Sequence, residues 1–176
     1  QHSLFQFIIG YHGYSPVRRT FTSNFFSDTA LAYGDPQRVA DQVGIFKLDS
    51  RPLGPVVRAR AEASDRIAWL GQQPPEEVQR LMLNAAFVVV PSRVYETFGR
   101  VAVEAFACGT PVIASRLGAL AEIVADGRTG LHFTPGDAAD LAAKVAWAWA
   151  HPEEMAAMGR RARAEYEARY TPERNY

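Results

Sequence analysis

The sequence has a single cysteine, no excess charge of either sign and no long apolar run, and each absence excludes a class of protein. Cys108 has no second cysteine with which to form an internal disulfide, which favours a reducing, cytoplasmic setting. Its apolar sequence neighbours predict a buried thiol. The 19 basic and 19 acidic side chains give a formal net charge of zero, unlike the basic balance of a nucleic-acid-binding protein. No segment approaches the roughly 18 consecutive apolar residues of a membrane-spanning helix. We therefore expect no nucleic-acid partner and no transmembrane segment.

Two kinds of motif are also missing. The histidines, which are His2, His12, His132 and His151, lie at no spacing typical of metal ligands, and the sequence contains no Asp-x-Asp pair. No G-x-G-x-x-G segment follows a predicted strand, which argues against a dinucleotide-binding dehydrogenase. The sequence therefore predicts a site that uses neither a metal nor a cofactor.

From about residue 66 onward, short apolar segments alternate regularly with helical ones. Strands are predicted at 66–70, 86–90, 111–114 and 130–133, and helices at 74–85, 99–107, 120–125, 137–150 and 152–170. The first 52 residues are less regular, with two further strands predicted at 5–9 and 43–48. Strands that alternate with helices form a parallel sheet covered on both faces. We therefore predict an α/β fold, a Rossmann-like parallel sheet with helices on both faces, in a single domain.

The loop after the predicted strand 86–90 contains a glutamate on each side of a helix start. In open parallel sheets, ligands bind beyond the carboxyl ends of the strands, which is where the loop 91–98 lies. The helix that begins near Gly99 offers unpaired backbone N–H groups and a positive dipole end to an anion. Glu104 lies about 7.5 Å further along that helix, at about 1.5 Å per residue. Glu96 and Glu104 could therefore accept hydrogen bonds from sugars on the two sides of a diphosphate.

A simpler interpretation is that both glutamates are solvated surface residues, since two glutamates at this spacing are common. The neighbours of Glu104 argue against it, because Val103, Ala105 and Phe106 make the helix apolar over most of its surface. A carboxylate among buried neighbours needs hydrogen bonds to offset its desolvation. We therefore expect Glu104 to have a binding role.

The segment 91–115, P-S-R-V-Y-E-T-F-G-R-V-A-V-E-A-F-A-C-G-T-P-V-I-A-S, closely resembles the donor-binding, C-terminal half of the GT-B-type glycosyltransferases of family 4. These are retaining enzymes that use nucleotide sugars. The similarity continues through G-A-L-A-E-I-V at 118–124, D-G-R-T-G-L at 126–131 and F-T-P-G-D at 133–137. It covers roughly residues 53–176, while residues 1–52 are atypical of the family. The resemblance implies that residues 1–176 form a nucleotide-sugar-binding domain, one half of a GT-B architecture.

The resemblance also implies a role for each matching residue. The first glutamate of the pair contacts hydroxyls of the transferred sugar, which makes Glu96 the candidate catalytic residue. The second glutamate, Glu104 here, binds the nucleotide ribose. Backbone amides after the first glutamate hold the diphosphate, and the turn after the strand 66–70 lies where the family seats the base. The matching residues are Phe98, Gly99, Arg100 and Val101 for the diphosphate, and Gly71 and Gln72 for the base.

The first turn departs from the family pattern. Members usually carry a Gly-Arg-x-x-x-x-Lys-Gly turn whose arginine and lysine neutralise the diphosphate. Here Gly13 occupies the place of the arginine, and Arg18 could stand in for the lysine. Arginine and lysine are not equivalent phosphate ligands, so the alternative that Arg18 and Arg19 are solvated surface charges stays open.

The reaction implied by the resemblance transfers a sugar, with retention, from a nucleotide-diphosphate sugar to an acceptor hydroxyl. The acceptor half of such enzymes precedes the donor half, and the sequence shows no second half of this kind. One alternative is therefore a non-catalytic nucleotide-sugar-binding module that pairs with an acceptor domain or with another copy of itself. A second is a nucleotide-sugar epimerase, although its acid and base residues are not evident. The acceptor, the base and the sugar are not specified by the sequence.

Overall fold

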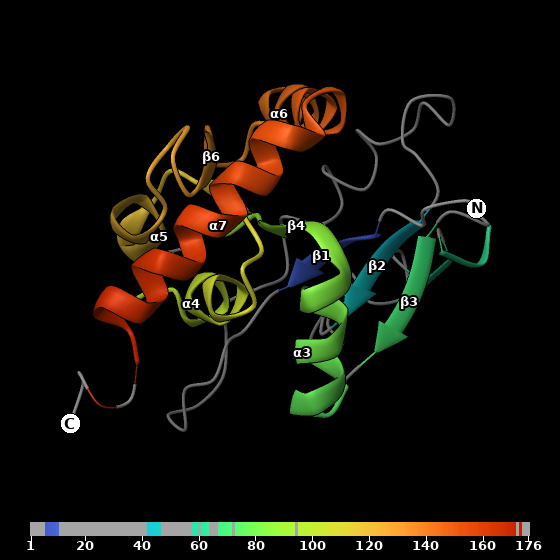
Figure 1. The fold of residues 1–176 in the computed structure, drawn as a ribbon. Helices are drawn as coiled ribbons and strands as arrows, with labels where there is room; N and C mark the ends of the chain where they lie inside the picture. Colours follow the sequence, from blue (N-terminus) through green and yellow to red (C-terminus); the bar gives the residue numbers. More distant parts are fainter. Residues whose placement is uncertain are drawn as a thin grey trace.

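Six parallel strands form one sheet with helices packed on both of its faces (Figure 1). The computed structural model describes residues 6–10, 42–46, 58–59, 61–63, 67–71, 73–93, 95–171 and 173. The strands are β1 (Gln6–Gly10), β2 (Gln42–Phe46), β3 (Ile67–Gly71), β4 (Ala85–Val90), β5 (Val112–Ser115) and β6 (Gly130–Phe133). The helices are α3 (Pro75–Asn84), α4 (Arg100–Ala107), α5 (Gly118–Ile123), α6 (Ala138–Ala150) and α7 (Pro152–Arg169).

The strand order is β3-β2-β1-β4-β5-β6, and each neighbouring pair is parallel. This is the order of the doubly wound Rossmann fold, in which the winding direction reverses between the first and the fourth strand. The predicted fold class is therefore confirmed. The strands predicted in the irregular first 52 residues occur as β1 and β2, and they form the part of the sheet on the other side of the reversal.

The apolar run of β4 is explained by burial on both faces of the sheet. Phe87 and Val89 point into a core cluster formed with β5, β6, α6 and the start of α7. Val88 and Val90 point into a second cluster, formed with α3, α4 and α5. Because successive side chains of a strand alternate between faces, a strand covered on both sides must be apolar throughout.

Helix α7 joins the two layers, because it contributes to both core clusters. Met155 and Met158 belong to the first cluster, and Ala162, one turn later, belongs to the second. The helix runs from its contact with α6 to its contact with α4 (Figure 1). Helix α7 therefore packs against α4, the helix that follows the loop 91–98.

Most predicted boundaries differ from the structure by one residue, and two elements differ by two residues. The strand predicted at 43–48 is β2, which ends two residues earlier, at Phe46. The helix predicted at 120–125 is α5, which begins two residues earlier, at Gly118. Cys108 was expected to be a buried thiol, and this was wrong, because it caps the carboxyl end of α4 and is only half-buried. Partial burial raises the pKa of the Cys108 thiol, while the Arg163 guanidinium lowers it and the Glu104 carboxylate raises it.

Candidate functional site

The loop from Pro91 to Gly99 leaves the sheet at the carboxyl end of β4, beside the point where the winding reverses. Such a point forms a crevice, because the connections on its two sides turn away to opposite faces of the sheet. Pro91 and Ser92 are buried at the base of the loop, and Ser92 is only 2% exposed. Further along, the side chains of Tyr95 and Phe98 are 80% and 59% exposed. The loop is thus anchored at its start and presents its later residues to solvent.

Glu96 is half-buried between these two exposed aromatic residues. Burial raises the pKa of its carboxyl, and a hydrogen bond donated by the Ser92 side chain lowers it in part. Burial penalises the charged form of a carboxyl group, and a donor that bonds to the charged form favours it. Glu96 is therefore a carboxylate with an accessible side that still needs hydrogen-bond donors, as the hydroxyl groups of a sugar would supply.

Helix α4 begins directly after the loop, and the first backbone N–H groups of a helix have no partner within it. Gly99 is the N-cap residue in the left-handed conformation, at φ 57°, and it provides no side-chain cap. The N–H groups of Ala102 and Val103 donate to the Gly99 carbonyl at 2.9 and 3.4 Å. Among the residues described, no recorded backbone bond uses the N–H of Arg100 or Val101. These two amides and the helix dipole can bind a phosphate group.

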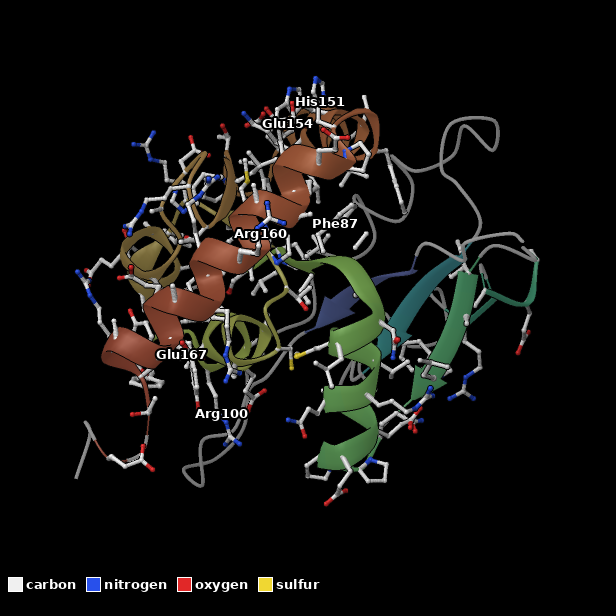
Figure 2. All side chains as sticks on the ribbon, viewed as in Figure 1. Phe87, Arg100, His151, Glu154, Arg160 and Glu167 are labelled. Carbon is white, nitrogen blue, oxygen red and sulfur yellow. The ribbon has the colours of Figure 1, made fainter. Side chains whose placement is uncertain are left out.

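Glu104 lies one turn into α4, where the carboxylate is bonded to Arg100. The Nε atom of Arg100 donates to Oε1 of Glu104 at 2.6 Å, and the Glu104 side chain is 31% exposed. Figure 2 shows Arg100 at the start of α4. The neighbouring Val103, Ala105 and Phe106 are buried, as the sequence predicted. An ionised carboxylate has about four acceptor positions, so this ion pair leaves Glu104 able to accept from ribose hydroxyls.

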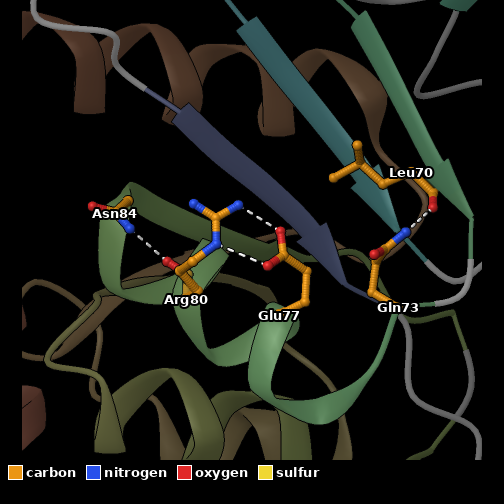
Figure 3. A network of polar contacts seen from close by, with 5 residues as sticks. All are labelled: Leu70, Gln73, Glu77, Arg80 and Asn84. Atoms are coloured by element: carbon orange, nitrogen blue, oxygen red, sulfur yellow. Dashed lines mark hydrogen bonds and ion pairs between the residues drawn. The ribbon is translucent and has the colours of Figure 1, made fainter.

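The turn after β3 lies at the same edge of the sheet, three strand positions from β4. At about 4.8 Å per position, the carboxyl ends of β3 and β4 are on the order of 14 Å apart. Gly71 is the last residue of β3, and the Gln73 side chain donates to the carbonyl of Leu70 (Figure 3). The ion pair of Glu77 with Arg80 in the same view is a surface pair along α3. Gly71 therefore lies at a position suited to one end of an extended ligand.

The remaining predicted residues are not all described. Gln72, Gly13 and Arg18 lie outside the described residues. Sequence reasoning missed the partners of both glutamates, Ser92 and the side chain of Arg100. The i, i+4 spacing of Arg100 and Glu104 was a usable signal, because such pairs face each other on a helix.

The described residues show neither a metal cluster nor a membrane helix. No group of three or more His, Cys, Asp or Glu side chains in this part of the chain could hold a metal ion. The ring of His132 contacts the carbonyl of Leu120, and that of His151 stacks on Trp147. No helix within the described ranges is long and apolar enough to cross a membrane. The prediction of metal-free chemistry stays a prediction.

Comparison with known proteins finds glycosyltransferases both by sequence and by fold. The family model described as "Glycosyl transferases group 1" matches residues 58–165, a range that contains Glu96 and Glu104. The alpha-maltose-1-phosphate synthase of Mycolicibacterium smegmatis is 42% identical over 92 residues, which are 51% of this chain and 24% of that protein. The matched stretch is therefore less than a quarter of the length of that relative.

Two solved structures share the fold over almost the whole chain. Sucrose-phosphate synthase from Thermosynechococcus elongatus is 29% identical with a TM-score of 0.77, over 97% of this chain and 42% of that one. HepE from Anabaena, solved in complex with UDP and glucose, is 25% identical with a TM-score of 0.73, over 96% of this chain and 45% of that one. Both likenesses agree with the Rossmann-like parallel sheet.

Proposed function

Because the chain belongs to the group 1 glycosyl transferase family, we propose that it binds a nucleotide-diphosphate sugar and transfers the sugar, with retention, to an acceptor hydroxyl. The observation that carries this proposal is the position of Glu96 and Glu104 on the two sides of the first turn of α4. A nucleotide sugar has the same order of groups: a sugar, a diphosphate and a ribose. The chain covers less than half of its solved relatives, so the activity of the whole protein belongs to the proposal.

In the proposed complex, each part of the site has one task. The Glu96 carboxylate accepts hydrogen bonds from the transferred sugar, and the Glu104 carboxylate accepts from the ribose hydroxyls. The amides of Phe98, Gly99, Arg100 and Val101 surround the diphosphate, which gains negative charge as the bond to the sugar breaks. Preorganised donors aimed at developing charge lower the barrier of such a step. Gly71 and Gln72 would contact the base, and Arg18 would approach the diphosphate.

We also propose that this electrostatic stabilisation replaces a metal ion. The support is the absence of an Asp-x-Asp pair from the sequence, together with the amino terminus of α4, which has no side-chain cap. The single cysteine favours a cytoplasmic setting, which we include in the proposal. Residues 1–176 would form one nucleotide-sugar-binding domain, since β1 and β2 belong to the same sheet as β4. The HepE complex with UDP and glucose makes uridine nucleotides the first donors to test.

A second candidate function is nucleotide-sugar binding without turnover. It is favoured by the presence of Glu96, Glu104 and the start of α4 in this one domain, because these groups could bind a nucleotide sugar without an acceptor. Under this proposal, the acceptor would be held by another chain or by a second copy of this one. Sugar release or transfer by the isolated chain would reject this second function, and a dimer in solution scattering would show whether a second copy is present.

Replacing Glu104 with alanine tests the nucleotide site. We expect UDP, or whichever of UDP, GDP and ADP binds most tightly, to bind roughly 10- to 100-fold more weakly. The reason is that hydrogen bonds to a charged group contribute about 1.5–3 kcal/mol. Isothermal titration calorimetry of the wild-type and variant chains measures this change.

The matched control is Glu167→Ala. Glu167 lies on α7 (Figure 2). It accepts from Nε of Arg163 at 2.7 Å, in an i, i+4 pair like that of Arg100 with Glu104 on α4. Its removal should leave the affinity unchanged. Failure of the wild-type chain to bind any of the three nucleotides, or an equal loss in both variants, would reject the site.

A further inference from the structure

The start of α5 contacts the backbone of Glu96, although the two lie far apart in the sequence. The N–H of Ala119 donates to the carbonyl of Glu96 at 3.2 Å. A Cβ atom on Gly118 would lie 3.2 Å from the same carbonyl oxygen and 3.3 Å from the Glu96 nitrogen. These separations are shorter than the roughly 3.5–4.0 Å of ordinary contact. The helix therefore meets the peptide of Glu96 directly, at a place where a side chain would crowd that peptide.

Gly118 also adopts a backbone conformation that favours glycine. Its φ is +53°, in the left-handed region, and it is the first residue of α5. Any other residue would combine the strain of that conformation with the crowding of the Glu96 peptide. The side chain of Tyr95, which would also be 3.2 Å away, is 80% exposed and can move aside. The Glu96 peptide is less free to move, because the N–H of Ala119 bonds to its carbonyl.

Ser92 holds the other end of Glu96. Its side chain is 2% exposed and donates a hydrogen bond to the Glu96 carboxylate. A buried hydroxyl needs a partner, and a buried donor has few alternative orientations. The carboxylate and the backbone of Glu96 are therefore both held by neighbours in the protein.

We propose that Ser92, Gly118 and Ala119 are positioning residues that hold Glu96 in the orientation in which its carboxylate contacts the donor sugar. This inference rests on the proposed function for the role of Glu96. It assigns a task to the segment 118–119, which the resemblance included without a role. Positioning residues of this kind affect contacts to the sugar and leave contacts to the nucleotide unchanged.

The test compares Gly118→Ala with Gly127→Ala. Gly127 has a φ of +71°, and nothing lies within 4 Å of a Cβ added there. The two variants therefore share the backbone strain, and only the first crowds Glu96.

The measured quantities are the dissociation constants of UDP and UDP-glucose, or of the corresponding pair with the base that the wild-type chain prefers. We expect Gly118→Ala to weaken UDP-glucose binding about tenfold or more while UDP binding stays within about twofold, because displaced contacts lose most of their effect. Gly127→Ala should change neither.

Titration of the Glu96 carboxyl by NMR provides a second readout that needs no ligand. In Ser92→Ala, the titration midpoint of Glu96 should rise, because a bond to the charged form is lost. Equal sugar binding in Gly118→Ala and Gly127→Ala, or an unchanged midpoint in Ser92→Ala, would overturn the inference. A wild-type chain that binds no nucleotide would reject the proposed function alone, since the titration still measures whether Glu96 is held.

Discussion

Replacing Gly159 with alanine is expected to lower the melting temperature of the protein by about 4–8 °C, although alanine is the better helix former. Gly159 lies in α7, where helix propensity alone favours alanine by about 1 kcal/mol. A Cβ atom there would, however, lie 2.3 Å from the carbonyl oxygen of Gly109 and 3.2 Å from Cδ of Pro111. Overpacking of a core contact costs about 1–3 kcal/mol, and a contact with backbone falls at the upper end.

The opposing turn cannot move away easily. The N–H of Gly109 donates to the carbonyl of Phe106 at 2.9 Å, and the hydroxyl of Thr110 donates to the carbonyl of Met82 at 2.7 Å. The turn is therefore tied to α4 on one side and to α3 on the other. The added methyl group must push α7 away from α4, or bend both.

The control for this experiment is Ala156→Gly, an exposed position in the same helix. It should destabilise the protein by about 1 kcal/mol, the ordinary propensity difference. Thermal and urea unfolding followed by circular dichroism measure both changes. A higher melting temperature for Gly159→Ala would show that α7 does not pack on the Gly109 turn in solution.

Replacing Glu96 with glutamine is expected to reduce sugar transfer about 100-fold and to stabilise the fold at neutral pH. The loss of rate follows because an amide accepts fewer hydrogen bonds than a carboxylate and leaves the sugar misoriented. The gain of stability follows from the pKa of Glu96, which burial raises. A raised pKa means that the folded state binds the proton more tightly than the unfolded state. The stabilisation from the protonated form is therefore complete below the unfolded pKa and is lost as the pH rises through the folded pKa.

The stability difference between wild type and Glu96→Gln should accordingly grow as the pH rises from about 4.3, the ordinary glutamate value. Urea unfolding at a series of pH values from 4 to about 8 measures it. The hydrogen bond from Ser92 favours the charged form and reduces the difference. Glu122→Gln, at an exposed position of α5, is the control and should change neither rate nor stability.

Transfer is measured with UDP-glucose, or with the nucleotide sugar that the wild-type chain binds most tightly, in a chain that shows turnover. If the chain binds the nucleotide sugar without turnover, the ratio of the dissociation constants of UDP and UDP-glucose replaces the rate as the measured quantity. Full activity of Glu96→Gln would remove Glu96 from the site. A loss of activity with reduced stability would instead indicate a structural role.

Most of the secondary structure followed from local patterns. The valine-rich run of β4 and the glycine and proline residues between elements predicted the strands and helices of the regular part. The same patterns put Glu96 and Glu104 at the carboxyl edge of the sheet, because parallel strands end on one side. Both glutamates and the longest stretch of the family resemblance lie in the continuous segment 91–115, so no knowledge of packing was needed to find them.

Contacts between distant segments were decided by the tertiary structure. The sequence alone does not specify that β4 lies beside β1, or that the start of α5 meets the peptide of Glu96. It also predicted a buried thiol at Cys108, where the end of α4 leaves the side chain half-buried. Periodicity is set by residues three or four positions apart, whereas a pair such as Glu96 and Gly118 meets only when strands and helices pack. The sequence by itself thus determined the strands and helices and the positions of the two glutamates along the chain. The packing of those elements determined which neighbours contact each glutamate.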